Sequence, residues 1–127
     1  MAVTLDTGLK ATLVGDVSIA ALISTRCYPM QLPQEPTLPS LTYRRISAPN
    51  GREFGDRAFT QARYQITAWD DTYLSAETLG DLVISLLDDY SGTMNGLHVS
   101  ATVLNDIPLY DEESGRHAYV VDVELWH

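Results

Sequence analysis

Two histidines and a glutamate are the residues whose chemistry could build a metal site. His98 begins one predicted strand (residues 97–104), whereas Glu124 and His127 end another (residues 117–126). If these strands pair antiparallel, the start of one lies beside the end of the other, and the three side chains converge. Two imidazoles and a carboxylate can hold zinc. The spacing matches no known zinc motif, and a terminal histidine is poorly ordered, so surface histidines on strand ends are the simpler interpretation.

Three other residues were weighed as catalytic groups. Asp70 and Asp71 could exchange a proton as general acid and base, but their position between a predicted strand and a predicted helix favours helix capping. Cys27 follows Arg26, and a neighbouring positive charge lowers a thiol pKa. No histidine is close in sequence, so a half-buried structural cysteine is the better interpretation. The sequence has no glycine-rich phosphate loop. We therefore predict no enzymatic activity, no cofactor and no metal.

The charge distribution indicates a protein interface. The chain has 17 acidic and 8 basic residues, a net charge of −9, and a pI of about 4.5. A DNA-coating role is excluded, because phosphate binding needs a basic face. Arginine is favoured in fixed protein contacts. Five of the seven arginines fall within twenty residues, and we take them as candidate interface residues: Arg44, Arg45, Arg52, Arg57 and Arg63.

Asp88 and Asp89 complete the candidate interface. They lie at the end of a predicted helix, where the helix dipole is negative and a carboxylate is unfavourable by roughly 0.3–1 kcal/mol unless a cation lies opposite. Two explanations stay open. The carboxylates are simply solvated, or they contact an arginine of another chain.

The helical elements follow from the spacing of apolar residues. With 127 residues, the chain is expected to form one domain, residues 1–127. Residues 3–23 predict two helical pieces, with Leu5, Leu9 and Leu13 on one face and a break at Gly15. Residues 72–90 predict the longest helix, with an apolar stripe that includes Tyr90. Gly80 within it costs about 1 kcal/mol relative to alanine.

Alternation and proline content predict the remaining elements. Four prolines within residues 29–39 exclude a helix, so we expect an extended arm on the surface. Strands are predicted over residues 41–47, 59–69, 97–104 and 117–126, with an acidic connection over residues 106–116. In the second strand, Arg63, Gln65 and Thr67 should share a polar face. These elements predict an α+β fold with a mainly antiparallel four-stranded sheet, helices packed on one face and the extended proline-rich arm.

The N-terminal segment predicts where the chain folds. The first ten residues contain Asp6 and lack the basic start and apolar core of a signal peptide. No apolar run approaches the length of about 20 residues that a membrane helix needs. We therefore expect no membrane contact and folding in a cytoplasm.

Three groups of short motifs resemble one known family over nearly the whole chain, from about Leu5 to the last residue. Together they are similar to the tail-completion, or tail-terminator, proteins of long-tailed bacteriophages and prophages. The motifs, as they stand here, are Y-P-x-x-L-P-Q (residues 28–34) with L-P-S-L-T-Y-R-R-I-S (38–47); Q-I-T-A-W (65–69) with Tyr73; and D-x-x-L-Y-D (106–111) with V-E-L-W-H (123–127).

The resemblance implies a structural role in the virion. Subunits of this family form a six-membered ring that caps the head-proximal end of the tail tube and contacts the head connector. The implied partners are other copies of the chain, the tail tube protein and the connector or head-closure protein. Assembly is expected in the host cytoplasm. The family brings no catalytic residues.

The charge is compatible with that role, because six copies would carry 6 × −9 = −54 charges. A channel lined with such charge lets DNA slide through without sequence-specific binding. Two alternatives stay open, a different neck component such as a head-closure adaptor and, more distantly, a small metal enzyme using His98, Glu124 and His127.

Overall fold

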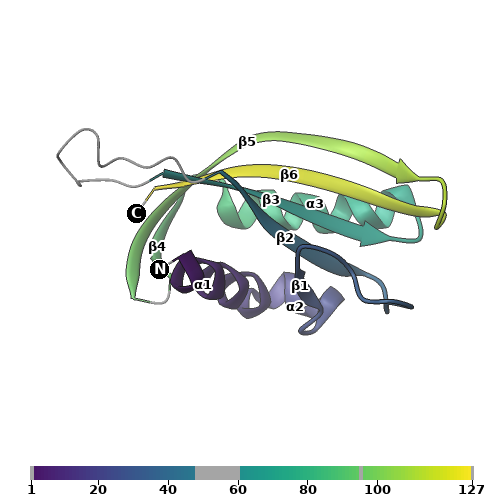
Figure 1. The fold of residues 1–127 in the computed structure, drawn as a ribbon, viewed down its shortest axis with the longest axis horizontal. Coiled ribbons are helices and arrows are strands. Elements are labelled where there is room, and N and C mark those ends of the chain that lie inside the picture. The colour runs from purple at the N-terminus through teal and green to yellow at the C-terminus, as the bar shows by residue number, and fades with distance from the viewer. Residues whose placement is uncertain (1, 48–60, 95, 127) are drawn as a thin grey trace.

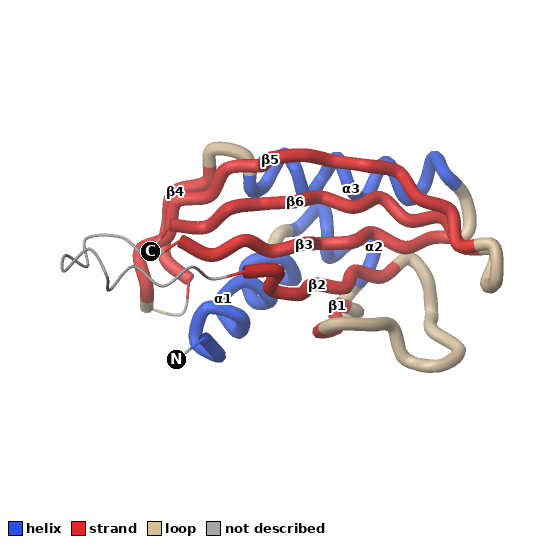
Figure 2. The backbone as a smooth tube through the Cα atoms, turned by 45° about the horizontal axis from the view of Figure 1, so that its top comes forward, coloured by secondary structure: helices blue, strands red, loops and turns tan. Residues whose placement is uncertain are grey.

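The computed structural model describes residues 2–47, 61–94 and 96–126. Three helices and six strands are present in this part of the chain, and the strands form one sheet in the order β1-β2-β3-β6-β5-β4 (Figure 2). The helices are α1 (Ala2–Gly15), α2 (Val17–Ile23) and α3 (Tyr73–Leu87). The strands are β1 (Cys27–Pro29), β2 (Ser40–Ser47), β3 (Gln61–Asp70), β4 (Tyr90–Met94), β5 (Leu97–Asp111) and β6 (Arg116–Trp126).

The sheet is curled, and the helices lie on its concave face, as Figure 1 shows. The core lies between the two layers. It includes Leu79 and Val83 from α3 against Tyr64 of β3 and Val123 of β6, all fully buried. None of the described helices lies on the opposite face of the sheet. Burial of one face explains the alternation of apolar and polar residues along β3.

The expected four-stranded antiparallel sheet is wrong, because the sheet has six strands and is mixed. At one edge, β1 pairs parallel with β2, with Cys27 opposite Leu41. At the other edge, β4 pairs antiparallel with β5. β1 was missed because a three-residue strand that ends at a proline carries almost no periodic signal. β4 was missed because Tyr90 continues the apolar spacing of the preceding helix.

Side-chain caps fix where two of the helices begin. The first helical piece ends at Gly15, and the carboxylate of Asp16 then accepts the backbone N–H of Ile19 at 3.1 Å, which starts α2. Thr72 caps α3 in the same way through the N–H of Ser75. The predicted end at residue 90 is three residues too late, because Asp88 is extended and Asp89 has a positive φ of 64°.

Gly80 is required by the packing of α3 on the sheet. A Cβ at this position would lie 2.2 Å from Cδ2 of Tyr119 on β6. The glycine therefore allows the helix to approach the tyrosine ring directly. Glycine lowers the helix propensity of α3, but it is the residue that permits this close packing.

β5 is longer than predicted because it runs on through Pro108. It ends at Asp111, and β6 begins at Arg116, so only a four-residue turn remains of the expected acidic connection. β4 pairs with β5 only as far as Ala101. Past that residue no described strand lies on the outer side of β5. A proline is tolerated in such an edge strand, because its missing N–H can face away from the sheet.

The proline-rich arm lies between β1 and β2, and it is largely exposed, as predicted. The side chain of Arg26 connects the proline-rich arm to α2 through two hydrogen bonds. Its Nε donates to the carbonyl oxygen of Pro39 at 3.0 Å, and its Nη2 donates to that of Leu22 at 2.9 Å. This arginine therefore has a structural role that its sequence position beside Cys27 did not indicate.

Candidate functional site

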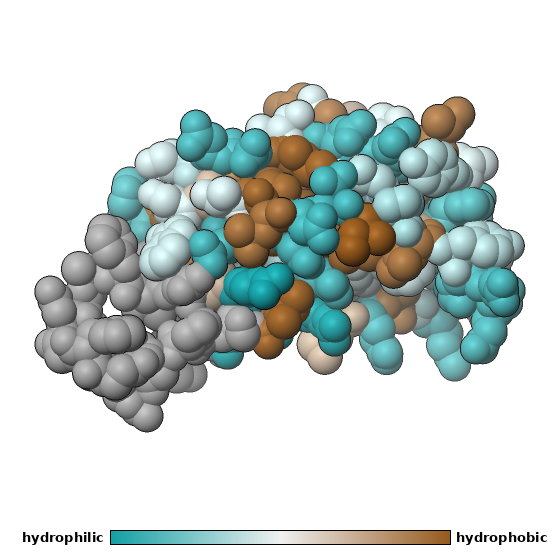
Figure 3. Space-filling model, turned by 90° about the horizontal axis from the view of Figure 1, so that it is seen from above, coloured by the Kyte–Doolittle hydropathy of each residue, from teal (hydrophilic) through white to brown (hydrophobic). Residues whose placement is uncertain are grey.

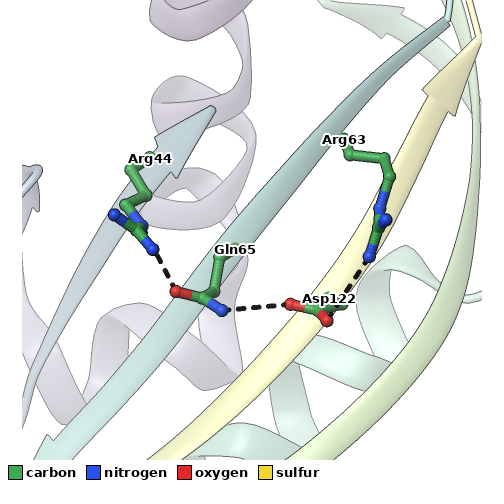
Figure 4. Close-up of polar contacts among 4 residues, drawn as sticks. All are labelled: Arg44, Arg63, Gln65 and Asp122. Atoms are coloured by element: carbon green, nitrogen blue, oxygen red, sulfur yellow. Dashed lines mark hydrogen bonds and ion pairs between the residues drawn. The ribbon is translucent and has the colours of Figure 1, made fainter. Parts of the chain in front are cut away.

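A chain of polar contacts crosses three strands on the uncovered face of the sheet (Figure 4). Nε of Arg44 donates to Oε1 of Gln65 at 3.3 Å, and Nε2 of Gln65 donates to Oδ1 of Asp122 at 3.4 Å. The guanidinium of Arg63 lies 3.7 Å from Oδ2 of the same carboxylate. These contacts are partly exposed, so they fix side-chain positions more than they stabilise the fold.

Two of the five candidate arginines, Arg44 on β2 and Arg63 on β3, are therefore brought to the same face of the sheet. Arg45 follows Arg44 along β2 and lies opposite the buried Tyr64, so its side chain points to the other face. The Nε of Arg63 is buried and has no hydrogen-bond partner among the described residues. Arg52 and Arg57 lie outside the described residues.

The two candidate aspartates lie at the other edge of the sheet. Asp88 follows α3, and its Oδ1 accepts the backbone N–H of Val103 on β5 at 3.4 Å. Asp89 is exposed beside it. Whether they meet an arginine of a second chain stays a prediction.

Apolar side chains gather on the same uncovered face, between the polar ones (Figure 3). A shallow pocket of about 440 Å³ lies there, with Trp69 on one side and Leu109 on the other. The indole Nε1 of Trp69 donates to Oγ1 of Thr42 at 3.0 Å. Ile107 and Leu109 remain 45% and 56% exposed. An uncovered sheet face with these residues is typical of a protein contact surface.

The proposed metal site is not formed by the described residues. β5 and β6 do pair antiparallel as predicted, but Glu124 lies opposite Thr102, four residues along the strand from His98. His98 lies opposite Thr93 of β4 instead. His127 lies outside the described residues, and no group of three potential ligands occurs within them.

The adjacent aspartates also differ from the expected arrangement. Asp70 accepts the N–H of Asp71 through its own side chain at 2.8 Å, whereas Thr72 provides the helix cap. The pair is therefore a local turn feature.

Cys27 is buried in the core, as a structural cysteine should be. Burial raises the pKa of its thiol to about 12, against a small opposing effect of Lys10. We expect it to react with a thiol reagent at pH 8 at least about a hundred times more slowly in the folded protein than in urea. Equal rates in the two conditions would show that the thiol is accessible.

Several aromatic residues near the β5–β6 turn make contacts that no sequence pattern indicated. The hydroxyl of Tyr119 donates to Asp106, and this bond, with burial, raises the pKa of the phenol. The tyrosine therefore stays protonated and remains a donor. The ring of His117 lies 4.7 Å from that of Tyr110 and 6.4 Å from that of Tyr73. These contacts explain two tyrosines by packing, as expected for an acidic protein.

The comparisons with known proteins identify the family. A family model described as Tail completion protein gp17 matches residues 7–127. The chain belongs to this tail-completion family of phage proteins. The membership confirms the resemblance found from the sequence motifs, and it makes the chain a structural protein of a phage-type tail.

Two solved structures share the fold of this tail-completion protein. A chain from the virion of a native gene transfer agent particle superposes with a TM-score of 0.78 at 14% identity, covering 98% of this chain and 94% of that one. A second solved protein gives a TM-score of 0.63, with the same identity and coverage. Among the curated proteins, the sequence search finds no match. At this identity the likeness establishes the shared fold.

No helix among the described residues has the length and apolar character needed to cross a membrane. The features that remain for function are the exposed arginines, the two aspartates and the uncovered sheet face. All of them suit contacts with other proteins.

Proposed function

We propose that this protein forms a ring, with six copies, that closes the head-proximal end of the tail tube and joins it to the head connector. The observation that carries the proposal is the family match over residues 7–127. The similar chain from the virion of a gene transfer agent particle supports it, because that chain has the same fold and comes from a virion.

The surface of the subunit supports an assembly role. In a ring, each copy uses two different patches, and the first patch of one copy binds the second patch of its neighbour. Arg44 and Arg45 on β2 lie toward one edge of the sheet and Asp88 and Asp89 lie at the other, so each subunit offers two unlike surfaces. The net charge of −9 per subunit would keep DNA from adhering to the wall of a central channel. The chain has no catalytic role in this proposal.

The test is native mass spectrometry and electron microscopy of the purified protein, alone and with its tail tube protein. We expect rings of six that bind to tube ends and block further growth. A protein that stays monomeric with tubes present would contradict the proposal. Binding to a portal-side protein without binding to tubes would instead indicate a head-closure adaptor.

A further inference from the structure

Two edges of the sheet are only partly paired, and they lie on opposite sides of the subunit. β1 covers β2 only from Leu41 to Tyr43, so residues 44–47 have no described strand on that side. β4 covers β5 only as far as Ala101, so residues 102–111 are likewise uncovered. We call these the basic edge (residues 44–47) and the acidic edge (residues 102–111 with Asp88 and Asp89).

We propose that the acidic edge of one copy pairs with the basic edge of the next, so that the sheets continue from subunit to subunit around the ring. This inference rests on the proposed ring. Beyond the ring itself, the inference specifies which two surfaces of neighbouring copies meet and the charges by which they recognise each other.

Backbone groups are available at both edges. Tyr43 presents its carbonyl oxygen outward, where it accepts the N–H of Met30 at 2.8 Å. Because alternate residues of an antiparallel pair face outward, Arg45 presents its N–H and carbonyl on the same side. On β5, the N–H of Val103 points outward to Asp88. The same alternation, carried through the β6 ladder, places the backbone groups of Asp106 and Tyr110 at the acidic edge.

Pro108 agrees with that assignment. It lies opposite Tyr119 in the β6 ladder, two residues from both Asp106 and Tyr110. A proline cannot donate a hydrogen bond, so its position must be one whose N–H side faces away from β6. Two independent features, the proline and the Val103 bond to Asp88, therefore give the same set of outward-facing positions.

The two edges also match in strand direction and in the position along the strands at which their charged residues lie. β2 and β5 run in opposite directions, because three antiparallel pairings separate them. Repeating the subunit sideways would thus place them antiparallel. Across the sheet, Arg44 is level with Gln65, Asp122 and then Asn105. The arginines of one copy would therefore arrive near the stretch of β5 that holds Val103 to Asp106.

The charges at that height are opposite. The basic edge carries Arg44 and Arg45, both exposed, and the acidic edge carries Asp88, Asp89 and Asp106, also exposed. Opposite charge favours this pairing over pairing of like edges. Apolar residues accompany the charges, since Ile46 and Leu104 are 42% and 45% exposed. The unfavourable carboxylates at the end of α3 would gain a cationic partner, which no described residue of the same subunit provides.

Charge reversal with mixing tests the pairing. One variant carries Asp88→Arg and Asp89→Arg, and the other carries Arg44→Glu and Arg45→Glu. The first variant removes the net negative charge of the acidic edge, and the second makes both edges negative, so we expect ring assembly of either variant alone to need at least about tenfold more protein than the wild type. An equimolar mixture should restore assembly as alternating rings, because each edge then meets its opposite.

Matched controls separate local charge from total charge. Glu112→Arg with Glu113→Arg makes the same change in the β5–β6 turn, and Lys10→Glu with Arg116→Glu matches the other variant. Both controls should assemble like the wild type. Melting curves check that each variant folds. The aspartate variant is expected to melt slightly lower than the wild type, because it loses the bond from Val103 to Asp88 and places arginine at the positive φ of residue 89.

A second measurement does not depend on the reversed charges. A variant with Arg44→Cys and Asn105→Cys, which are level and on the same face of the sheet, should give a covalent ladder ending at the ring when it is treated with a short bismaleimide, since the buried Cys27 stays unreactive. The pairing is overturned if both reversed variants assemble like the wild type, if their folded mixture stays unassembled, or if assembled rings yield no cross-links. A wild type that never assembles would overturn the proposed function itself, which is a different result.

Discussion

The substitution Gly80→Ala is expected to lower the free energy of unfolding by about 1–3 kcal/mol, as overpacking of a core does. Helix propensity alone predicts the reverse, a gain of about 1 kcal/mol. The added Cβ would lie 2.2 Å from Cδ2 and 2.9 Å from Cγ of Tyr119, well inside contact distance. Either α3 moves off the sheet or the tyrosine ring shifts and strains its bond to Asp106.

A double-mutant cycle measured by urea unfolding checks the cause. In a Tyr119→Ala background the same Gly80→Ala change should be neutral or stabilising, because the ring is gone. Gly15→Ala is the matched control, since nothing lies within 4 Å of its added Cβ. If Gly80→Ala stabilises the otherwise unchanged protein, the close packing of α3 on β6 is incorrect.

The substitution Val123→Asp should have the larger effect, about 3–5 kcal/mol, because it leaves an unpaired charge in the core. Val123 has no exposed surface and lies on the central strand β6, opposite Tyr64 of β3. Because domains of this size are stable by only about 5–15 kcal/mol, such a loss is a large part of the total. We expect a much lower urea midpoint at neutral pH, measured by circular dichroism. Ser100→Asp, on an exposed position of β5, should fold like the wild type.

The deficit of Val123→Asp should depend on pH in a defined direction. Burial raises the pKa of the introduced carboxyl in the folded state above its unfolded value of about 3.9. A raised folded pKa means that protonation favours folding, so the deficit is largest at neutral pH and shrinks as pH falls toward about 4. A deficit that grows on acidification, relative to the wild type at the same pH, would contradict burial of this side chain.

Elements with a complete local signal could be predicted from the sequence. Leu9, Leu13 and the break at Gly15 determine α1, and Thr72 determines the start of α3. The alternation along β3 correctly placed its buried residues. The wrong predictions concern segments whose structure is set by pairing with a distant strand and not by the local sequence pattern. A three-residue β1 is a strand only because β2 lies beside it, and Tyr90 leaves the helix because β5 offers it a partner.

The candidate site was predictable only in part. The clustering of arginines is visible in the sequence, and Arg63 and Gln65 were correctly assigned to one face. Their partners were not visible, because Arg44 and Asp122 meet them only through the register of β2 and β6. The acidic edge was hidden for the same reason, since Pro108 reads as a strand breaker until the outer side of β5 is known to be unpaired.

The composition of that uncovered half of β5 has a consequence for solubility. A long exposed strand is ordinarily a template for amyloid-like stacking, which favours segments without proline and with little net charge. Here Pro108 interrupts the row of donors, and Asp106 and Asp111 make two identical segments repel each other. Newly made subunits can thus accumulate at high concentration without growing into fibrils, while the strand still accepts a neighbour of the opposite sign.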